Sequence, residues 1–123
     1  MSALSDPPTM AFLCRVDLQL SAGKLAVQCA HAAVESLKRA KKSHSRMVQR
    51  WNESTSRKVC LAVEDESELE YFLELVQEAS LPFAVIKDAG LTEVPPGTVT
   101  VLGVGPGSRH TMDSLFQSLR TYD

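Results

Sequence analysis

Two periods of hydrophobic and polar positions alternate along this chain. Short, mostly apolar runs predict four β-strands, at residues 11–18, 58–63, 83–87 and 98–104. Apolar positions three and four residues apart predict helices at 21–42, at 45–53, from 65 onward, and at 112–119. Helices connect the earlier strands and favour parallel pairing, whereas a loop without a helix joins the last two strands. The pattern therefore predicts an α/β fold, a three-layer α/β/α sandwich around a mixed four-stranded sheet.

The first predicted helix carries a polar stripe among small apolar residues. The members of this stripe recur every three or four residues and share one helix face: Lys24, Gln28, His31, Glu35 and Lys38. We expect the rest of the helix to be buried over most of its circumference, so that the stripe meets water, another protein or a ligand. Ser21 is placed to cap the helix, whose positive N-terminal end would suit a phosphate group. An ordinary solvated face is the alternative interpretation.

The loop at 87–100, between the third and fourth predicted strands, is stiff and polar. It combines Asp88 and two prolines with the hydroxyl groups of Thr92 and Thr98. Ligands of open α/β sheets bind beyond the carboxyl ends of the strands, which is where this loop begins. We therefore expect Asp88 to face the same cleft as Lys24. The alternative is a plain connection in which the acid and the threonines hydrogen-bond to their own backbone.

The length of 123 residues suffices for one hydrophobic core, and we expect a disordered tail at 1–10 followed by a single domain at 11–123. The net charge of −2 is unevenly placed, because 65–78 is acidic whereas cations gather before it: Lys38, Arg39, Lys41, Lys42, His44, Arg46, Arg50, Arg57 and Lys58. This basic run either attracts a polyanion or is a solubilising helix end and loop. The chain shows no long apolar span, and its first residues lack the arginines of a mitochondrial presequence, so we expect a cytoplasmic protein.

The three cysteines, Cys14, Cys29 and Cys60, are far apart in the sequence and lie in apolar patterns without a CxxC pair. This spacing favours buried thiols in a reducing compartment over disulfides or a zinc site. We therefore assign all three to the hydrophobic core and expect no metal site.

Several motifs occur in a fixed order along the chain and together carry a family resemblance. They are RVDL at 15–18, GKLAVQCAHAA at 23–33, Trp51, DAGLT at 88–92 and TVLGVGP at 100–106. In this combination the sequence resembles the type 2 peptidyl-tRNA hydrolase family. The resemblance implies a homodimeric esterase, independent of metals and cofactors, that cleaves the bond between a peptide and the 3′ ribose of its tRNA. It also implies the three-layer sandwich that the pattern predicts separately.

The resemblance places residues that the family links to activity at Lys24, Asp88 and Thr92, and a tyrosine near the C-terminus at Tyr122. Motif positions that line the same cleft correspond to Gln28, His31 and Thr98. Among the basic residues we expect Arg39, Lys42 and Arg46 to contact the tRNA backbone. The apolar candidates for a dimer interface are Trp51, Phe116 and the apolar ends of the short helices. The chain departs from the usual family loop at Leu91 and Glu93, which replace an arginine and a glutamine.

Ester hydrolysis needs an activated water, stabilisation of the developing oxyanion and a proton for the leaving group. Our hypothesis is that Asp88 orients or deprotonates the water, Lys24 stabilises negative charge, and Thr92 and Thr98 donate hydrogen bonds. For His31 we favour substrate contact or a structural hydrogen bond over the role of base, because it lies about 10 Å along the helix from Lys24. Two other functions stay open: a non-enzymatic RNA- or protein-binding module on the same fold, and a small-molecule regulatory domain.

Overall fold

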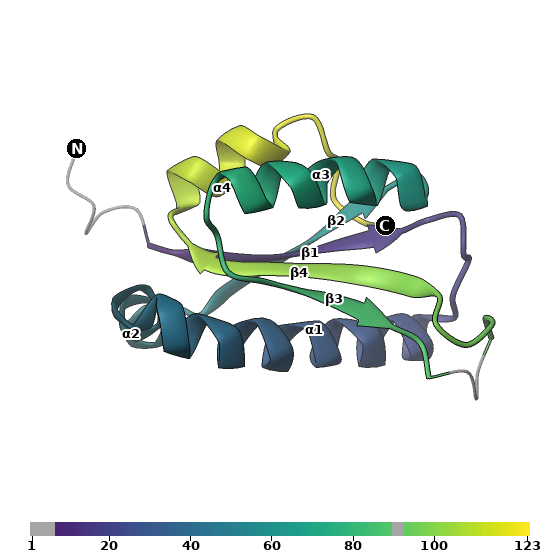
Figure 1. Cartoon of the computed structure of the whole chain (residues 1–123), viewed down its shortest axis with the longest axis horizontal. Helices are drawn as coiled ribbons and strands as arrows, with labels where there is room; N and C mark the ends of the chain where they lie inside the picture. Colours follow the sequence, from purple (N-terminus) through teal and green to yellow (C-terminus); the bar gives the residue numbers. More distant parts are fainter. Residues whose placement is uncertain (1–6, 90–92) are drawn as a thin grey trace.

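The computed structural model of the chain describes residues 7–89 and 93–123 and contains the predicted elements in the predicted order (Figure 1). They are β1 (Thr9–Arg15), α1 (Ala22–Ser43), α2 (Ser45–Glu53), β2 (Arg57–Val63), α3 (Glu66–Glu78), β3 (Phe83–Lys87), β4 (Val99–Gly107) and α4 (Arg109–Phe116). The α/β class is therefore confirmed. Within the described residues, none of the helices combines the length and the apolar character needed to cross a membrane.

The four strands form one mixed sheet in the order β2-β1-β4-β3. β1 and β2 run parallel, and β4 pairs antiparallel with both β1 and β3. The carboxyl ends of β1, β2 and β3 therefore meet the start of β4 at one end of the strands, which we call the carboxyl edge of the sheet. This edge is where a ligand site is expected in such a fold.

Helices cover both faces of the sheet, with α3 and α4 on one side and α1 and α2 on the other (Figure 1). Each face has its own apolar cluster, and these clusters contain Phe116 and Trp51, which are only 5% and 4% exposed. Phe116 packs against Phe72 with ring centroids 5.9 Å apart, and the indole of Trp51 donates a hydrogen bond to the Arg57 carbonyl. Both aromatic rings are buried inside one copy of the chain, so the prediction that they form a dimer interface is wrong.

The helix α1 packs closely on β4 because its inner face consists of small residues. A Cβ atom at Gly103 would lie 2.9 Å from the carbonyl oxygen of Ala32, so only glycine fits this crossing. The Ser36 hydroxyl donates a 2.6 Å hydrogen bond to the carbonyl of Gly105. The fully packed side of the helix is therefore a four-residue repeat: Gln28, Ala32, Ser36 and Ala40.

The outer side of α1 faces solvent, with Val27 49% and Val34 53% exposed. The expectation that most of this helix is buried is therefore wrong. The expectation that Gln28 belongs to a stripe that meets water, another protein or a ligand is also wrong, because Gln28 is buried against the sheet. The physical reason is that a single helix layer covers this face of the sheet, so each helix in the layer keeps an outer surface.

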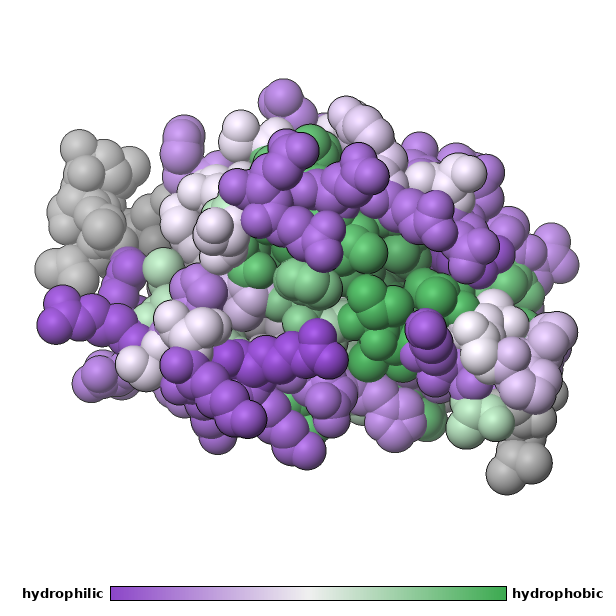
Figure 2. Space-filling model, viewed as in Figure 1, coloured by the Kyte–Doolittle hydropathy of each residue, from purple (hydrophilic) through white to green (hydrophobic). Residues whose placement is uncertain are grey.

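The strand β3 forms an edge of the sheet, since it pairs only with β4. Figure 2 shows apolar surface gathered between α3 and α1, in the region where Figure 1 draws this strand. The β3 side chains Phe83 and Val85 are half-buried there. This face of the molecule therefore keeps part of its apolar surface in contact with solvent.

Candidate active site

An ammonium and a carboxylate meet at the carboxyl edge of the sheet. Lys24 lies in the first turn of α1 and Asp88 follows β3 directly, and their Nζ and Oδ2 atoms are 2.9 Å apart. The Asp88 side chain is completely buried, whereas that of Lys24 is 15% exposed. The expectation that these two residues lie close together is confirmed, and the lysine is the member of the pair that reaches the surface.

Two backbone hydrogen bonds fix the start and end of the loop that follows β3. The amide of Asp88 donates to the carbonyl of Thr98, and the amide of Gly97 donates to the carbonyl of Asp88, both at 2.8 Å. Gly97 adopts a φ of +81°, a conformation that favours glycine. The loop thereby holds Thr98 beside Asp88. The Thr98 hydroxyl donates a 2.7 Å hydrogen bond to the carbonyl of Pro95, so its proton is engaged within the loop.

The carboxylate of Glu93 lies at the N-terminal end of α1. It accepts hydrogen bonds from the backbone amide and the hydroxyl of Ser21, at 2.9 Å and 2.6 Å. The hydroxyl bond, followed by the amide bond, holds the pKa of the Glu93 carboxyl below its usual value. This helix end suits an anion, as expected, but Glu93 takes the position that we assigned to a substrate phosphate.

Gln28 connects α1 to β4 beneath this edge. Its side chain is buried, and its Oε1 atom accepts a short hydrogen bond from the Thr100 hydroxyl. Thr100 is equally buried and also lies 3.3 Å from the carbonyl of Ile86. Gln28 is therefore one turn from Lys24 but packed against the sheet, where it fixes the position of the helix.

Asp17, at the end of β1, has a different partner from Asp88. Its carboxylate accepts two hydrogen bonds from Arg15, at 3.0 Å and 2.8 Å, and the hydrogen bonding lowers the pKa of the Asp17 carboxyl. Arg15 also donates to the carbonyl of Val99 at the start of β4. This arginine therefore joins β1 to β4 at the same edge of the sheet as the Lys24–Asp88 pair.

The other predicted site residues are spread over a wider surface. His31 is exposed on α1, and Lys42 and Arg46 are exposed near the far end of that helix. Arg39 donates a 3.1 Å hydrogen bond to the carbonyl of Phe83. The structure therefore separates the basic residues from Lys24: Arg39 is fifteen residues along α1 from it, about 22 Å.

Tyr122, the tyrosine expected at the site, lies near the C-terminus on the side of the sheet covered by α1 and α2. It is half-buried against the cluster that contains Trp51, and its amide donates to the carbonyl of Cys60. Two further positions from the sequence analysis, Thr92 and Leu91, lie outside the described residues.

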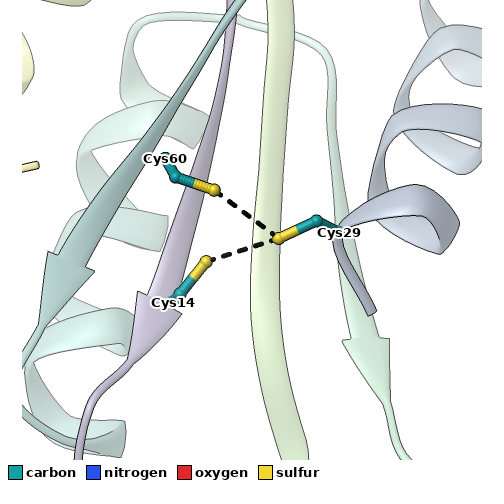
Figure 3. Close-up of side chains that lie close together, drawn as sticks. All are labelled: Cys14, Cys29 and Cys60. Carbon is teal, nitrogen blue, oxygen red and sulfur yellow. Dashed lines mark hydrogen bonds between the residues drawn. The ribbon is translucent and has the colours of Figure 1, made fainter. Parts of the chain in front are cut away.

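The structure also brings together three residues that are far apart in the sequence. Cys14 from β1, Cys29 from α1 and Cys60 from β2 point toward one another (Figure 3). The Sγ atom of Cys29 is 3.6 Å from that of Cys14 and 3.7 Å from that of Cys60. The core assignment is confirmed, with Cys14 buried and the other two half-buried against the same cluster. The sequence pattern does not predict that the thiols lie together; packing of the first helix on the first two strands places them so.

The three thiols differ in acidity because each lies beside the others. Hydrogen bonding with Cys29 and Cys60, together with burial, raises the pKa of Cys14 above its usual value. The same kind of contact from Cys14 and Cys29 lowers the pKa of Cys60. The half-buried Cys60 is therefore the thiol whose ionised form the cluster favours.

The fold and its edge site define an α/β domain in which a helix N-terminus and a strand end hold a cation–carboxylate pair whose carboxylate is buried. Comparison with known sequences agrees with this architecture: the family model "Peptidyl-tRNA hydrolase PTH2" matches residues 8–122. A peptidyl-tRNA hydrolase of Staphylothermus marinus is 39% identical over 106 residues, which cover 86% of this chain and 88% of that protein. One from Methanopyrus kandleri is 46% identical over 99 residues, covering 80% and 84%.

A human relative named peptidyl-tRNA hydrolase 2, mitochondrial, is 35% identical over 113 residues, which are 92% of this chain and 63% of the human protein. The chain belongs to the PTH2 family of peptidyl-tRNA hydrolases. The resemblance found in the sequence motifs is thereby confirmed. The comparisons favour the hydrolase over the non-enzymatic binding module.

Proposed function

We propose that this chain hydrolyses the ester bond of peptidyl-tRNA and releases the peptide and free tRNA. The observation that carries the proposal is the 2.9 Å pair of Lys24 and Asp88 at the sheet edge of a PTH2-family domain. An ammonium that is held in place and partly exposed suits a reaction in which a carbonyl oxygen acquires negative charge. No metal ion or cofactor enters this scheme.

Lys24 is the group of the pair that meets the substrate, since its side chain is partly exposed while that of Asp88 is buried. We assign to Lys24 the stabilisation of the oxyanion that forms when water attacks the ester carbonyl. Asp88 acts through Lys24, because the buried carboxylate holds the ammonium at a fixed place. This revises our hypothesis that Asp88 handles the water directly, because its side chain is fully buried.

The surrounding residues have supporting roles in this proposal. Thr98 orients the loop through its hydrogen bonds, and Thr92 is retained as a hydrogen-bond donor to the substrate. Gln28 keeps the first turn of α1 on the sheet through its bond from Thr100. His31 and Tyr122 are proposed to contact the tRNA or the peptide beyond the reacting bond.

Binding of the tRNA backbone is proposed for the basic end of α1 and the start of α2, with Arg39, Lys42 and Arg46 as contacts. The phosphates of an RNA stem extend far beyond a single ester group, so a separation of about 22 Å along the helix is compatible with one bound tRNA. Exposed cations also speed the encounter with a polyanion. The proposed roles are therefore divided between chemistry at one end of α1 and attraction at the other.

We further propose that the chain forms a homodimer through the outer face of α1. Val27, Ala30 and Val34 share this exposed face, and an exposed apolar strip is the kind of surface that a second copy covers. Light scattering at micromolar concentration tests the dimer. Val34→Lys should yield monomers, whereas Tyr71→Lys, which alters an exposed aromatic residue on α3, should leave dimers. A wild-type monomer would contradict the dimer.

A reducing compartment suits three adjacent thiols, and we propose the cytosol. The alternative is the mitochondrion, because the name of the human relative includes the word mitochondrial. Cell fractionation that recovers the chain in mitochondria would contradict the cytosolic assignment.

The test of the function is turnover of purified peptidyl-tRNA. The wild-type chain should release free tRNA with many turnovers per enzyme. A chain that binds peptidyl-tRNA without cleaving it would contradict the proposal and favour the non-enzymatic binding module instead. The Lys24→Met variant should bind peptidyl-tRNA with nearly the wild-type KM, but its kcat should be far lower, since the substitution removes a group that acts in the transition state.

A further inference from the structure

We propose that Cys14, Cys29 and Cys60 form a binding site for a thiophilic divalent metal ion, of which Zn²⁺ is the main candidate. This site is separate from the hydrolase site. The three sulfur atoms all lie within 4.8 Å of one another. In the part of the chain at 7–89 and 93–123, they are the only group of three or more potential ligand atoms gathered in this way.

The spacing of the sulfurs fits coordination by one ion. A tetrahedral Zn²⁺ with Zn–S bonds of about 2.3 Å places its sulfur ligands about 3.8 Å apart. The two sulfur–sulfur distances at Cys29 are 3.6 Å and 3.7 Å. The Sγ atoms of Cys14 and Cys60 lie within 4.8 Å of each other. At most, this one distance has to shorten to about 3.8 Å for the three ligands to surround one ion.

The rigidity of the fold supports the same site. The register of the parallel pair opposes Phe12 to Cys60 and Cys14 to Ala62, so the two strand cysteines are diagonal neighbours on one sheet face. Cys29 approaches this face from α1 (Figure 3). Three separate secondary-structure elements therefore supply the ligands, and binding of an ion would fasten the helix to both strands.

Charge favours a divalent ion over a monovalent one. Three thiolates and Zn²⁺ carry a single net negative charge, whereas three thiolates and Cu⁺ carry two, and the surroundings are the apolar side chains of the cluster that contains Trp51. Each thiol that binds releases its proton to solvent, because the thiolate is the ligand. Cys29 and Cys60 are half-buried, so a water molecule can reach the fourth position.

The site is distinct from the proposed hydrolase site. None of the three sulfurs belongs to the Lys24–Asp88 pair or to the loop after β3, and Cys60 lies on β2, the strand at the opposite edge of the sheet from β3. Metal binding and turnover of peptidyl-tRNA are therefore expected to vary independently when Cys60 is changed.

The experiment uses the reduced, metal-free, full-length chain without oxygen. Zn²⁺ is titrated in competition with a chromophoric chelator, and Co²⁺ serves as a spectroscopic probe of sulfur ligation. We expect one ion per chain, sulfur-to-metal charge-transfer bands with Co²⁺, and proton release on binding. Free Zn²⁺ at about one hundred times its Kd should raise the Tm of the chain by about 10 °C.

Variants assign the ligands. Cys29→Ala and Cys60→Ala should each weaken Zn²⁺ binding by about 100-fold or more, because each removes one of three ligands. Ala33→Ser is the matched control: it alters a residue that packs against the same cluster, keeps every sulfur, and should change affinity less than threefold. Cys60→Ala should retain wild-type turnover of peptidyl-tRNA, so failure of the metal proposal and failure of the hydrolase proposal are distinguishable.

Several results would overturn the metal site. These are wild-type protein that binds no Zn²⁺ below about 10 µM, far weaker than structural zinc sites, Co²⁺ spectra without sulfur bands, and affinity that the cysteine variants leave unchanged. Formation of a disulfide on exposure to air, with no Zn²⁺ binding by the reduced chain, would likewise contradict it. The wild-type titration and the Tm shift remain decisive even if a variant does not fold.

Discussion

The two ends of α1 carry cations in opposite settings. At the N-terminal end, the ammonium of Lys24 is 2.9 Å from a carboxylate whose side chain is fully buried. At the C-terminal end, Lys42 and the nearby Arg46 of α2 are exposed, and neither forms an ion pair within the described part of the chain. Lys24 and Lys42 are eighteen residues apart in the helix, about 27 Å.

This difference separates two uses of positive charge. A cation fixed by a buried partner stays in place, and in a poorly solvated setting it acts strongly on charge that develops next to it. Exposed cations on long side chains attract phosphates from a distance, and salt screens them. In the proposed enzyme, changes at the first end should alter kcat, and changes at the second end should alter KM and its dependence on salt.

The largest effect is expected from Lys24→Met. It should lower kcat for peptidyl-tRNA by about 10²- to 10³-fold, because it removes the cation at the reacting carbonyl. It should also lower the free energy of unfolding by about 3–5 kcal/mol, since the buried carboxylate of Asp88 would lose the ammonium that neutralises its charge. If Lys24 belonged to a fully exposed polar stripe, its removal would cost little stability. The larger loss is expected because Asp88 is buried.

Lys87→Met is the matched control for this prediction. Lys87 is exposed and precedes Asp88 directly, so its removal should change kcat less than twofold and stability by less than about 0.5 kcal/mol. Steady-state kinetics and urea unfolding measure both quantities. If Lys24→Met and Lys87→Met behave alike, the N-terminal end of α1 has no special role.

A smaller effect, confined to binding, is expected from the double substitution Lys42→Gln and Arg46→Gln. The slope of log KM against log salt should fall by about one unit for each phosphate that the variant no longer neutralises, with kcat unchanged. Lys58→Gln serves as the control, because Lys58 is exposed on β2, where its ammonium lies 5.0 Å from the Trp51 ring. A KM that does not depend on salt would remove tRNA from this surface.

The smallest effect is expected from Glu93→Gln. Because the pKa of the Glu93 carboxyl is lowered in the folded chain, its bonds to Ser21 stabilise the fold above the usual value of 4.5 and are lost as pH falls through the lowered pKa. Wild type should therefore lose slightly more stability than Glu93→Gln between about pH 5 and pH 3. Identical acid unfolding curves would show that the bonds contribute nothing.

The sequence allowed the fold and the main pair of the site to be predicted because both depend on local signals. Apolar periodicity located every element, and α2 and β3 have the predicted bounds. Lys24 follows a helix start and Asp88 follows a strand end, and the α/β topology brings such positions to one edge of the sheet. β1 and α4 begin two and three residues earlier than predicted, at Thr9 and Arg109.

The remaining features depend on packing that no local pattern contains. The contact of Glu93 with Ser21 joins positions 72 residues apart, and the cysteine cluster requires both the register of β1 on β2 and the rotation of α1. The same rotation decides that Gln28 faces the sheet while Val27 faces solvent. Helical spacing identifies residues that share a face but leaves open which face meets the sheet.

The central claim is that Asp88 acts through Lys24, and a double-mutant cycle tests it most directly. The free energy of unfolding and kcat are measured for Lys24→Met, Asp88→Asn and the combined variant. We predict that the combined variant is more stable than Lys24→Met alone, because an uncharged amide replaces the buried carboxylate that has lost its ammonium, while its kcat is no lower than that of Lys24→Met. Stability losses that simply add, together with a further drop in kcat when Asp88→Asn is added to Lys24→Met, would contradict the account and give Asp88 a separate role in the reaction.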